Sequence, residues 1–246
     1  MKEEQVVGRN PVKELLKNGR PIEKLMIAKG AEKTLGQIIA MAKESEIPLY
    51  FSDRERLDQI CEDKNHQGII AFVSGYEYAE MEQLFQKADE KGETPFFVIL
   101  DGIEDPHNLG AILRSADGSG VHGIIIPKRR AVGVTSVVAK VSAGAIEYVP
   151  ICRVSNLTQT INELKKQGFW IAGVDMGQDK YYQCNLTGKI CLVIGNEGNG
   201  ISKLVKENCD FIVSIPMYGG VSSLNASNAA AITFYEVRRQ RELDKG

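Results

Sequence analysis

Short apolar runs recur through the second part of this 246-residue chain and restrict the folds that it can adopt. The runs are FFVIL (96–100), GIIIP (123–127), YVPI (148–151), FWIAGV (169–174), ICLVIG (190–195) and FIVSIP (211–216). Most of them are separated by segments long enough for a helix, such as residues 157–167. Buried strands that alternate with helices are typical of a mostly parallel sheet that is covered on both faces. The pattern therefore predicts an α/β domain over residues 96–246.

The first part of the chain shows a different pattern, which predicts a small α/β module over residues 1–74. Apolar stretches predict strands at 24–28, 47–51 and 69–73, and helical spacing predicts a helix at 34–45. A cap followed by proline at Asn10 and Pro11 predicts another helix start, as does a capping box at Ser52 and Glu55. Residues 75–95 are polar and acidic and end in Gly and Pro, so we expect a surface helix and a linker there.

Composition excludes several classes of protein. Hydrophobic residues make up 43% of the chain and charged residues 25%, which rules out a disordered chain. No apolar run approaches the roughly 18 residues of a membrane span, and the N-terminus MKEEQVVGRN has no apolar signal core. We therefore expect a cytoplasmic protein. Five cysteines without a C-x-x-C pair and only three histidines argue against a metal site.

The charge of the chain is balanced, with 30 Lys and Arg against 32 Asp and Glu. Neither half carries the excess of positive charge that a general polyanion binder needs, so any contact with nucleic acid must come from a local patch. The run Lys128, Arg129 and Arg130, directly after GIIIP, is a candidate for contacts with phosphates. A solvated loop explains the same run equally well.

Three loops follow apolar runs, at the position where parallel sheets place ligand sites. The first, DGIEDPHNLG (101–110), leads into a helix that carries Arg114. Asn108 is suited to the start of this helix, and Arg114 stands out in an otherwise apolar segment. Two interpretations stay open here. These residues could serve a site, or Asn108 could be only a cap and Arg114 the partner of a neighbouring carboxylate.

The other two loops are rich in glycine and small residues. GNEGNG (195–200) would let backbone amides approach a ligand closely, although a plain tight turn has the same composition. IPMYGGVSSLN (215–225) opens a helix that begins NASNAAA, and its small side chains permit close packing of the backbone. An ordinary capped helix, with Arg238, Arg239 and Arg241 complementing the helix dipole, is the alternative.

Taken together, these segments resemble the three motifs of the SpoU (TrmH) family of RNA 2′-O-ribose methyltransferases. The matching segments are DPHNLGAILRSADGSGV, LVIGNEGNGIS and IPMYGGVSSLNASNAAAITFYEVRRQR. The resemblance covers residues 96–246, and residues 1–74, with NHQGIIA at 65–71, resemble the substrate (RNA)-binding domain of the same family. It implies a SPOUT fold, in which a parallel-sheet domain ends in a deep trefoil knot, and it implies a homodimer.

The same resemblance implies the chemistry. The closest subgroup transfers a methyl group from S-adenosylmethionine to the ribose 2′-hydroxyl of a guanosine in large-subunit ribosomal RNA, without a metal; transfer RNA is the alternative substrate. Carried over by motif, the residues that line the donor site are Gly195, Ile215 and Leu224, with Val174 and Asp175 as weaker candidates. The catalytic candidates are Asn108, Arg114, Glu197, Ser223 and Asn225.

Two other classes of protein share parts of this pattern. A dinucleotide-dependent oxidoreductase also places glycine loops after parallel strands, but no G-x-G-x-x-G fingerprint follows the first strand of either module. A non-catalytic RNA-binding protein is the second alternative. The polar motif residues are all retained together, which favours an enzyme.

Overall fold

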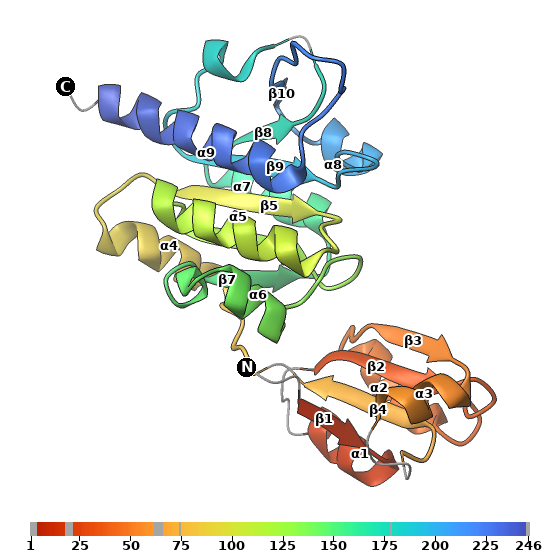
Figure 1. Cartoon of the computed structure of the whole chain (residues 1–246). Helices are drawn as coiled ribbons and strands as arrows, with labels where there is room; N and C mark the ends of the chain where they lie inside the picture. The colour runs from red at the N-terminus through yellow and green to blue at the C-terminus, as the bar shows by residue number, and fades with distance from the viewer. Residues whose placement is uncertain (1–3, 18–21, 62–65, 74, 178, 245–246) are drawn as a thin grey trace. The chain divides into compact units, whose positions relative to one another are not determined.

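The computed structural model of the chain describes residues 4–17, 22–61, 66–73, 75–177 and 179–244. The chain divides into two compact units (Figure 1). The first contains residues 1–77 with 133–136, and the second contains residues 78–132 and 137–246. Each unit is built around a sheet of its own.

The first unit contains a four-stranded sheet in the order β1-β4-β2-β3. Its elements are β1 (Glu4–Val7), α1 (Arg9–Lys17), β2 (Ile22–Ala28), α2 (Gly36–Glu44), β3 (Leu49–Ser52), α3 (Arg54–Ile60) and β4 (Ile69–Val73). Strand β4 pairs antiparallel with β1 and β2, whereas β2 and β3 are parallel. Alternate residues of β4 belong to different clusters: Ile69 and Ala71 pack in one core, and Ile70 packs in another with Leu57 of α3. This unit is therefore a small α/β module, which is the class of fold predicted for residues 1–74.

The capping box predicted at Ser52 and Glu55 is wrong. Ser52 is the last residue of β3, and the N-cap of α3 is Asp53, whose side chain makes no capping hydrogen bond. The pairing of β3 with β2 extends to Ser52, opposite Ala28, which keeps Ser52 in the strand.

The second unit contains a six-stranded sheet in the order β10-β8-β9-β5-β6-β7, and every pair in it is parallel. Its strands are β5 (Phe96–Asp101), β6 (Gly123–Pro127), β7 (Ile151–Val154), β8 (Trp170–Val174), β9 (Ile190–Gly195) and β10 (Phe211–Val213). Its helices are α4 (Met81–Glu90), α5 (Pro106–Ser119), α6 (Ser136–Val141), α7 (Leu157–Lys166), α8 (Lys203–Glu207) and α9 (Ala226–Leu243), with short 3-10 turns η1 (Ala145–Glu147) and η2 (Tyr181–Gln183). The predicted parallel sheet is confirmed.

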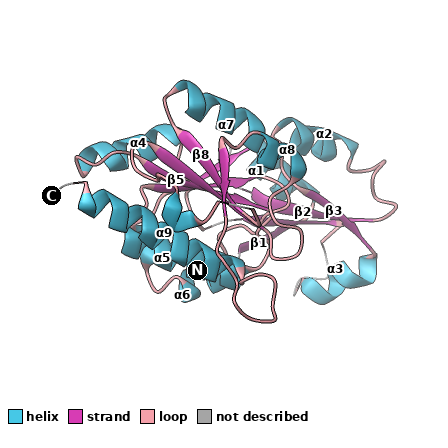
Figure 2. Cartoon of the chain, turned by 90° about the horizontal axis from the view of Figure 1, so that it is seen from above, coloured by secondary structure: helices cyan, strands magenta, loops and turns pink. Residues whose placement is uncertain are grey.

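Helices cover both faces of this sheet, as expected from its continuous apolar runs. Phe97 and Ile99 of β5 point into a core formed with α4, α7 and α8. Phe96 points the other way and meets Phe234 of α9 edge to face, with 5.9 Å between the ring centroids. Figures 1 and 2 show α5 and α9 side by side on this second face.

Two of the expected elements differ from the structure. Only Ile151 of the run YVPI belongs to a strand, because the amides of Tyr148 and Val149 bond to the carbonyl of Ala145 and continue the turn η1. The helix expected within 75–95 is α4, and it is part of the second unit. Its Leu84 is fully buried and lies against Gly123, where a Cβ atom would overlap the leucine side chain.

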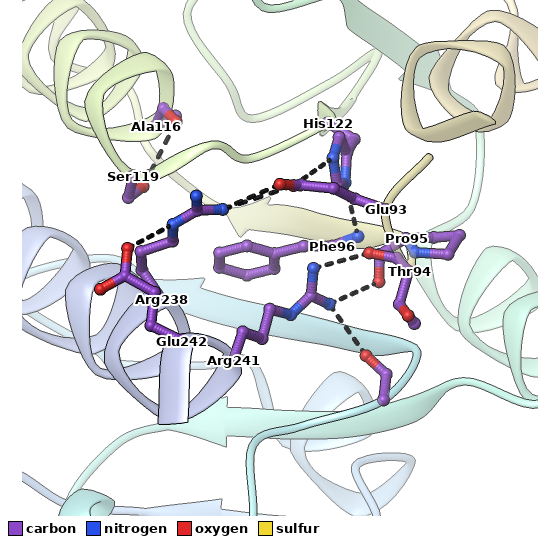
Figure 3. A network of polar contacts seen from close by, with 11 residues as sticks. Glu93, Thr94, Pro95, Phe96, Ala116, Ser119, His122, Arg238, Arg241 and Glu242 are labelled. Carbon is purple, nitrogen blue, oxygen red and sulfur yellow. Dashed lines mark hydrogen bonds and ion pairs between the residues drawn. The ribbon is translucent and has the colours of Figure 1, made fainter. Parts of the chain in front are cut away.

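The end of α9 is fastened to the segment that leads into β5 (Figure 3). The guanidinium of Arg241 donates to the carbonyls of Thr94 (2.6 Å), Pro95 (3.0 Å) and Gly188 (2.8 Å). Arg238 pairs with Glu93 at 3.1 Å, so the terminal arginines do more than complement the helix dipole.

Next to the carboxylate of Glu93 lies His122, which is completely buried. Its Nδ1 accepts a hydrogen bond from the amide of Phe96 at 3.0 Å, and its Nε2 is 3.3 Å from the carboxylate of Glu93 (Figure 3). Burial lowers the pKa of His122 to about 4, and the positive charges of Lys91 and Arg241 contribute to the shift. The imidazole is therefore neutral at pH 7.

No helix in the described part of the chain is long and apolar enough to cross a membrane.

The buried imidazole predicts a loss of stability in mild acid. Because the pKa of His122 is lower in the folded state than the ordinary value of 6.5, the unfolded chain binds more protons between pH 6.5 and 4, and the free energy of unfolding falls there. Between pH 7 and pH 5 this group should cost about 2 kcal/mol. His122→Asn keeps an acceptor for the Phe96 amide and removes the titrating ring. Urea unfolding at both pH values should show a pH dependence smaller by that amount in the variant, and an unchanged dependence would contradict the assignment.

Candidate functional site

Three side chains from three distant loops meet beyond the carboxyl ends of β5 and β9. Asn108 donates from its side-chain amide to Oε1 of Glu197. Asn225 donates from Nδ2 to Oδ1 of Asn108 at 3.0 Å and to Oε1 of Glu197 at 3.5 Å. The three residues are separated by 89, 28 and 117 positions in the chain. The structure thus brings together three of the five residues predicted as catalytic.

The pairing of β5 with β9 explains why the first two loops meet. The two strands are adjacent and parallel, and their last paired residues are Asp101 and Gly195. Two bonds join the loops that follow: Asn196 donates from Nδ2 to the carbonyl of Gly102 at 2.9 Å, and the amide of Ser202 donates to Asp101 at 2.7 Å. Asn196 was not singled out from the sequence, although it is the first polar residue after a buried strand.

Asn108 is not a helix cap. Helix α5 begins at Pro106, and its N-cap is Asp105, whose carboxylate accepts a bond from the amide of His107 at 2.9 Å. Asn108 lies within the first turn and is buried, with 7% of its surface exposed. A buried amide needs hydrogen-bond partners, and Glu197 and Asn225 supply them.

Asn225 combines two roles at one position. It is the N-cap of α9, and its Oδ1 accepts from the amide of Ser227 at 2.9 Å. Because the cap uses the oxygen, the Nδ2 group is left to face Asn108 and Glu197. The interpretation of this segment as a capped helix is therefore correct, and the cap itself orients a side chain of the site.

A cavity of about 360 Å³ lies beside this cluster, at the ends of β8 and β9. All three predicted donor-site residues, Gly195, Ile215 and Leu224, line it. The rest of its wall comes from the loops after β8, β9 and β10 and from the start of α9, and it includes Val174, Asp175, Met176, Ile194, Asn196, Glu197, Met217, Ser222, Ser223, Ala226 and Ala229. Apolar residues line this wall together with glycines and a few polar side chains, a composition typical of a site for a small organic ligand.

Gly195 is required by the loop that it begins. The backbones of Asn196 and Gly200 exchange two hydrogen bonds, of 3.1 and 2.8 Å, and fold the loop back onto the end of β9. A Cβ atom at Gly195 would overlap the carbonyl carbon of Gly200 and the amide nitrogen of Ile201. The sequence suggested that the backbone of this loop approaches a ligand closely. In the structure, the atoms nearest to a Cβ atom at Gly195 belong to residues 200 and 201 of the protein itself.

Asp175 also lines the cavity. Its carboxylate accepts a bond from the amide of Met176 at 2.7 Å and pairs with Lys206 of α8 at 2.8 Å. This pair connects the loop after β8 to α8. Asp175 therefore lies at the cavity, as its weaker sequence signal predicted, and its carboxylate is already engaged on the protein side.

Arg114 makes no hydrogen bond to the cluster. It is on α5 and exposed, and among the described residues it has no hydrogen bond or ion-pair partner. The alternative that it pairs with a neighbouring carboxylate is therefore not seen. No group of three or more His, Cys, Asp or Glu side chains in the described residues could hold a metal ion.

Two family models match the chain and divide it between them. The model of the SpoU rRNA methylase family matches residues 95–235, and the model for substrate binding in RNA 2′-O ribose methyltransferases matches residues 5–79. The boundary between the two matches falls in the region of α4. Both matches agree with the resemblance seen in the loop motifs.

Individual relatives match over nearly the whole chain. A Bacillus subtilis protein, YacO, whose name places it in the TrmH family of tRNA/rRNA methyltransferases, is 49% identical over 96% of this chain and 95% of its own length. A Staphylococcus aureus protein with the same family name is 46% identical over 98% of both chains. Among solved structures, the SpoU methyltransferase AviRb of Streptomyces viridochromogenes, in complex with the cofactor AdoMet, is 26% identical with a TM-score of 0.62 and covers 98% of this chain and 91% of its own.

The contacts of Gly195 predict that even one added carbon destabilises the unit. Gly195→Ala would force the 196–200 loop away from β9, and overpacking of this kind typically costs about 1–3 kcal/mol. Gly219→Ala is a matched control, because a Cβ atom there meets nothing within 4 Å. Chemical unfolding of both variants tests the contrast. Equal stabilities would show that the loop accommodates the added carbon.

Proposed function

Because the chain belongs to the SpoU rRNA methylase family of RNA methyltransferases, we propose that it methylates a ribose 2′-hydroxyl of ribosomal RNA with S-adenosylmethionine as donor. A guanosine of the large-subunit RNA is the proposed target, and transfer RNA is the alternative. One observation carries the proposal. The cluster of Asn108, Glu197 and Asn225 borders the cavity lined by Gly195, Ile215 and Leu224, so polar groups and a ligand site share one edge of the sheet.

The cavity suits the donor in shape and charge. Ile215 and Leu224 offer apolar walls for the adenine ring, and the 195–200 loop borders the same space. The carboxylate of Glu197 stands on the wall without a cationic partner among the described residues, and it favours a donor that carries a sulfonium and an ammonium cation. The complex of AviRb with AdoMet supports the same choice of donor.

The reaction requires in-line attack of the ribose oxygen on the methyl carbon, so it depends on positioning. We infer that the two asparagine amides and the Ser223 hydroxyl orient the ribose. Glu197 holds both amides through its carboxylate, which limits the number of orientations that they can adopt. The hydroxyl must lose its proton as the new bond forms, and a positive charge nearby favours the developing alkoxide.

Arg114 is the proposed source of that charge. Its guanidinium has no partner among the described residues, so it is available to the substrate. An arginine normally stays protonated in proteins, which makes it a poor base. Two versions of its role remain: the guanidinium acts as the base itself beside the sulfonium, or the charged group stabilises the alkoxide while a phosphate or water accepts the proton. Both place its effect in the transition state.

Arg114→Ala should therefore slow methyl transfer without weakening donor binding. Removal of one such electrostatic group typically costs about 10²–10³ in rate. Single-turnover assays with labelled S-adenosylmethionine and unmodified 23S ribosomal RNA give the rate, and calorimetry gives the donor affinity. Arg114→Lys should recover little activity, because lysine lacks the planar fork. Lys166→Gln, at the far end of α7, is the control for loss of one exposed charge. A near-wild-type rate for Arg114→Ala would exclude both versions.

The choice of substrate is tested in cells. Ribose methylation is mapped across all ribosomal and transfer RNA in a strain that lacks the protein, and one site should disappear. Loss of a guanosine methylation in 23S RNA would support the proposal, and loss of a transfer RNA site would select the alternative. If every ribose methylation persisted, the proposed function would be wrong.

We further propose that the first unit supplies RNA affinity and the second unit binds the donor. The fragment 78–246, which retains α4 and its buried Leu84, should bind S-adenosylmethionine like the full chain but methylate 23S RNA poorly. Full activity of this fragment would contradict the division. The deep knot and the homodimer that the family resemblance implies stay predictions; sedimentation of the full chain tests the homodimer.

A further inference from the structure

The loop after β6 presents three consecutive cations next to the candidate site. Lys128, Arg129 and Arg130 directly follow β6, whose last residue is Pro127. In the sheet, β5 lies between β9 and β6, and all three strands are parallel. The segments after β9, β5 and β6 therefore leave the same edge of the sheet in that order. The segment after β9 carries Glu197, and the segment after β5 leads to Asn108 in the first turn of α5.

This loop is held at both ends by hydrogen bonds. At its start, the amide of Lys128 donates to the carbonyl of Val154 at 2.9 Å, and Arg153 donates from Nη2 to the carbonyl of Lys128 at 3.1 Å. At its end, the amide of Val132 donates to the carbonyl of Ile103 at 2.9 Å. Ile103 is buried in the same loop that leads to Asn108. The cationic loop and the loop of the site are thus joined directly.

The backbone of Arg130 has an unusual conformation. Its φ angle is +57°, in the left-handed region that residues other than glycine rarely adopt. Such a conformation persists where the surrounding structure holds it, and it is found more often at functional sites than elsewhere.

The positive charges of Arg129 and Arg130 are not neutralised by any residue that the structure describes. Arg129 and Arg130 are exposed, and neither forms an ion pair with a described residue. The acidic side chains of the adjoining loop are Glu104, which is exposed, and Asp105, which caps α5. The arginines near the end of α9 behave differently, because Arg238 and Arg239 pair with carboxylates.

We propose that Arg129 and Arg130 bind backbone phosphates of the RNA beside the nucleotide that is methylated. This inference rests on the proposed function and assigns the contact to one loop. Guanidinium groups match the geometry of phosphate oxygens, and phosphate contacts fix the register of a protein on a nucleic acid without reading its sequence. Lys128 stands at the anchored base of the loop, so the two arginines that follow it carry the contact.

Salt dependence tests the contact directly. Each phosphate neutralised by a protein cation adds about 0.7–0.9 to the slope of log affinity against log salt concentration. The double variant Arg129→Gln/Arg130→Gln should therefore lower the slope for unmodified 23S ribosomal RNA by about 1.4–1.8. The matched control is Lys166→Gln/Lys189→Gln. These two exposed lysines lie just before β8 and β9, at the edge of the sheet opposite the candidate site, so the slope should stay unchanged.

The outcomes separate this inference from the proposed function. Calorimetry with S-adenosylmethionine should give the same donor affinity for the double variant and the wild type, which shows that the cavity is intact. A slope equal to that of the wild type would overturn the inference and leave a solvated loop. Because the slope is a binding measurement, it is informative even if the wild type methylates none of the RNA tested, a result that would instead count against the proposed function. An equal loss of slope in the control would show a nonspecific charge effect and would also overturn the inference.

Discussion

The pairing of β5 with β9 is the constraint on which the rest of the site depends. The two strands run parallel from Phe96 opposite Ile190 to Asp101 opposite Gly195, without a shift in register. A slip of one residue would exchange the side chains that pack on the two faces, such as Phe97 in the core with α4 and Phe96 against Phe234, so close packing on each face fixes the register. With that register fixed, the two loops start side by side, and the bonds from Asn196 and Ser202 then set their shape.

The third part of the site is added by a helix start. Asn225 caps α9 through its oxygen and reaches the other two loops through its nitrogen, so the direction of the helix and the geometry of the cluster depend on the same side chain. A cap of this kind contributes about 1 kcal/mol to stability. Replacement of Asn225 would affect the site by more than that energy, because the buried side chain of Asn108 would also lose a hydrogen-bond partner.

Much of this arrangement could be predicted from the sequence, for reasons that also explain the failures. Buried parallel strands leave continuous apolar runs, so β5, β6 and β9 were predicted almost to the residue. The start of α5 was missed although its cue was present: Asp105 and Pro106 follow the rule of cap and proline. The same rule was applied at Asn10, where it predicted a helix correctly but placed its start wrongly, because α1 begins at Arg9.

Other features leave no local signal in a single sequence. The bond between Asn108 and Asn225 spans 117 residues, and the requirement for glycine at 195 comes from the backbone of residues 200 and 201. The role of α4 was also hidden, because a polar segment with one buried face resembles a surface helix until Leu84 is placed against Gly123.

The position of α9 has a consequence for the order in which the molecule is assembled during synthesis. Helix α9 is made after the other described elements, yet its Asn225 completes the cluster and its Arg241 fastens the segment before β5, which lies 146–147 residues earlier in the chain. Domains generally fold as units while the ribosome delivers the chain from its N-terminus, so the first unit can form early. In the second unit, the side of β5 that carries Phe96 lacks its contact with Phe234 until α9 leaves the exit tunnel. A truncated product from an interrupted message would therefore lack the third member of the cluster as well as the part of the cover of β5 that α9 supplies.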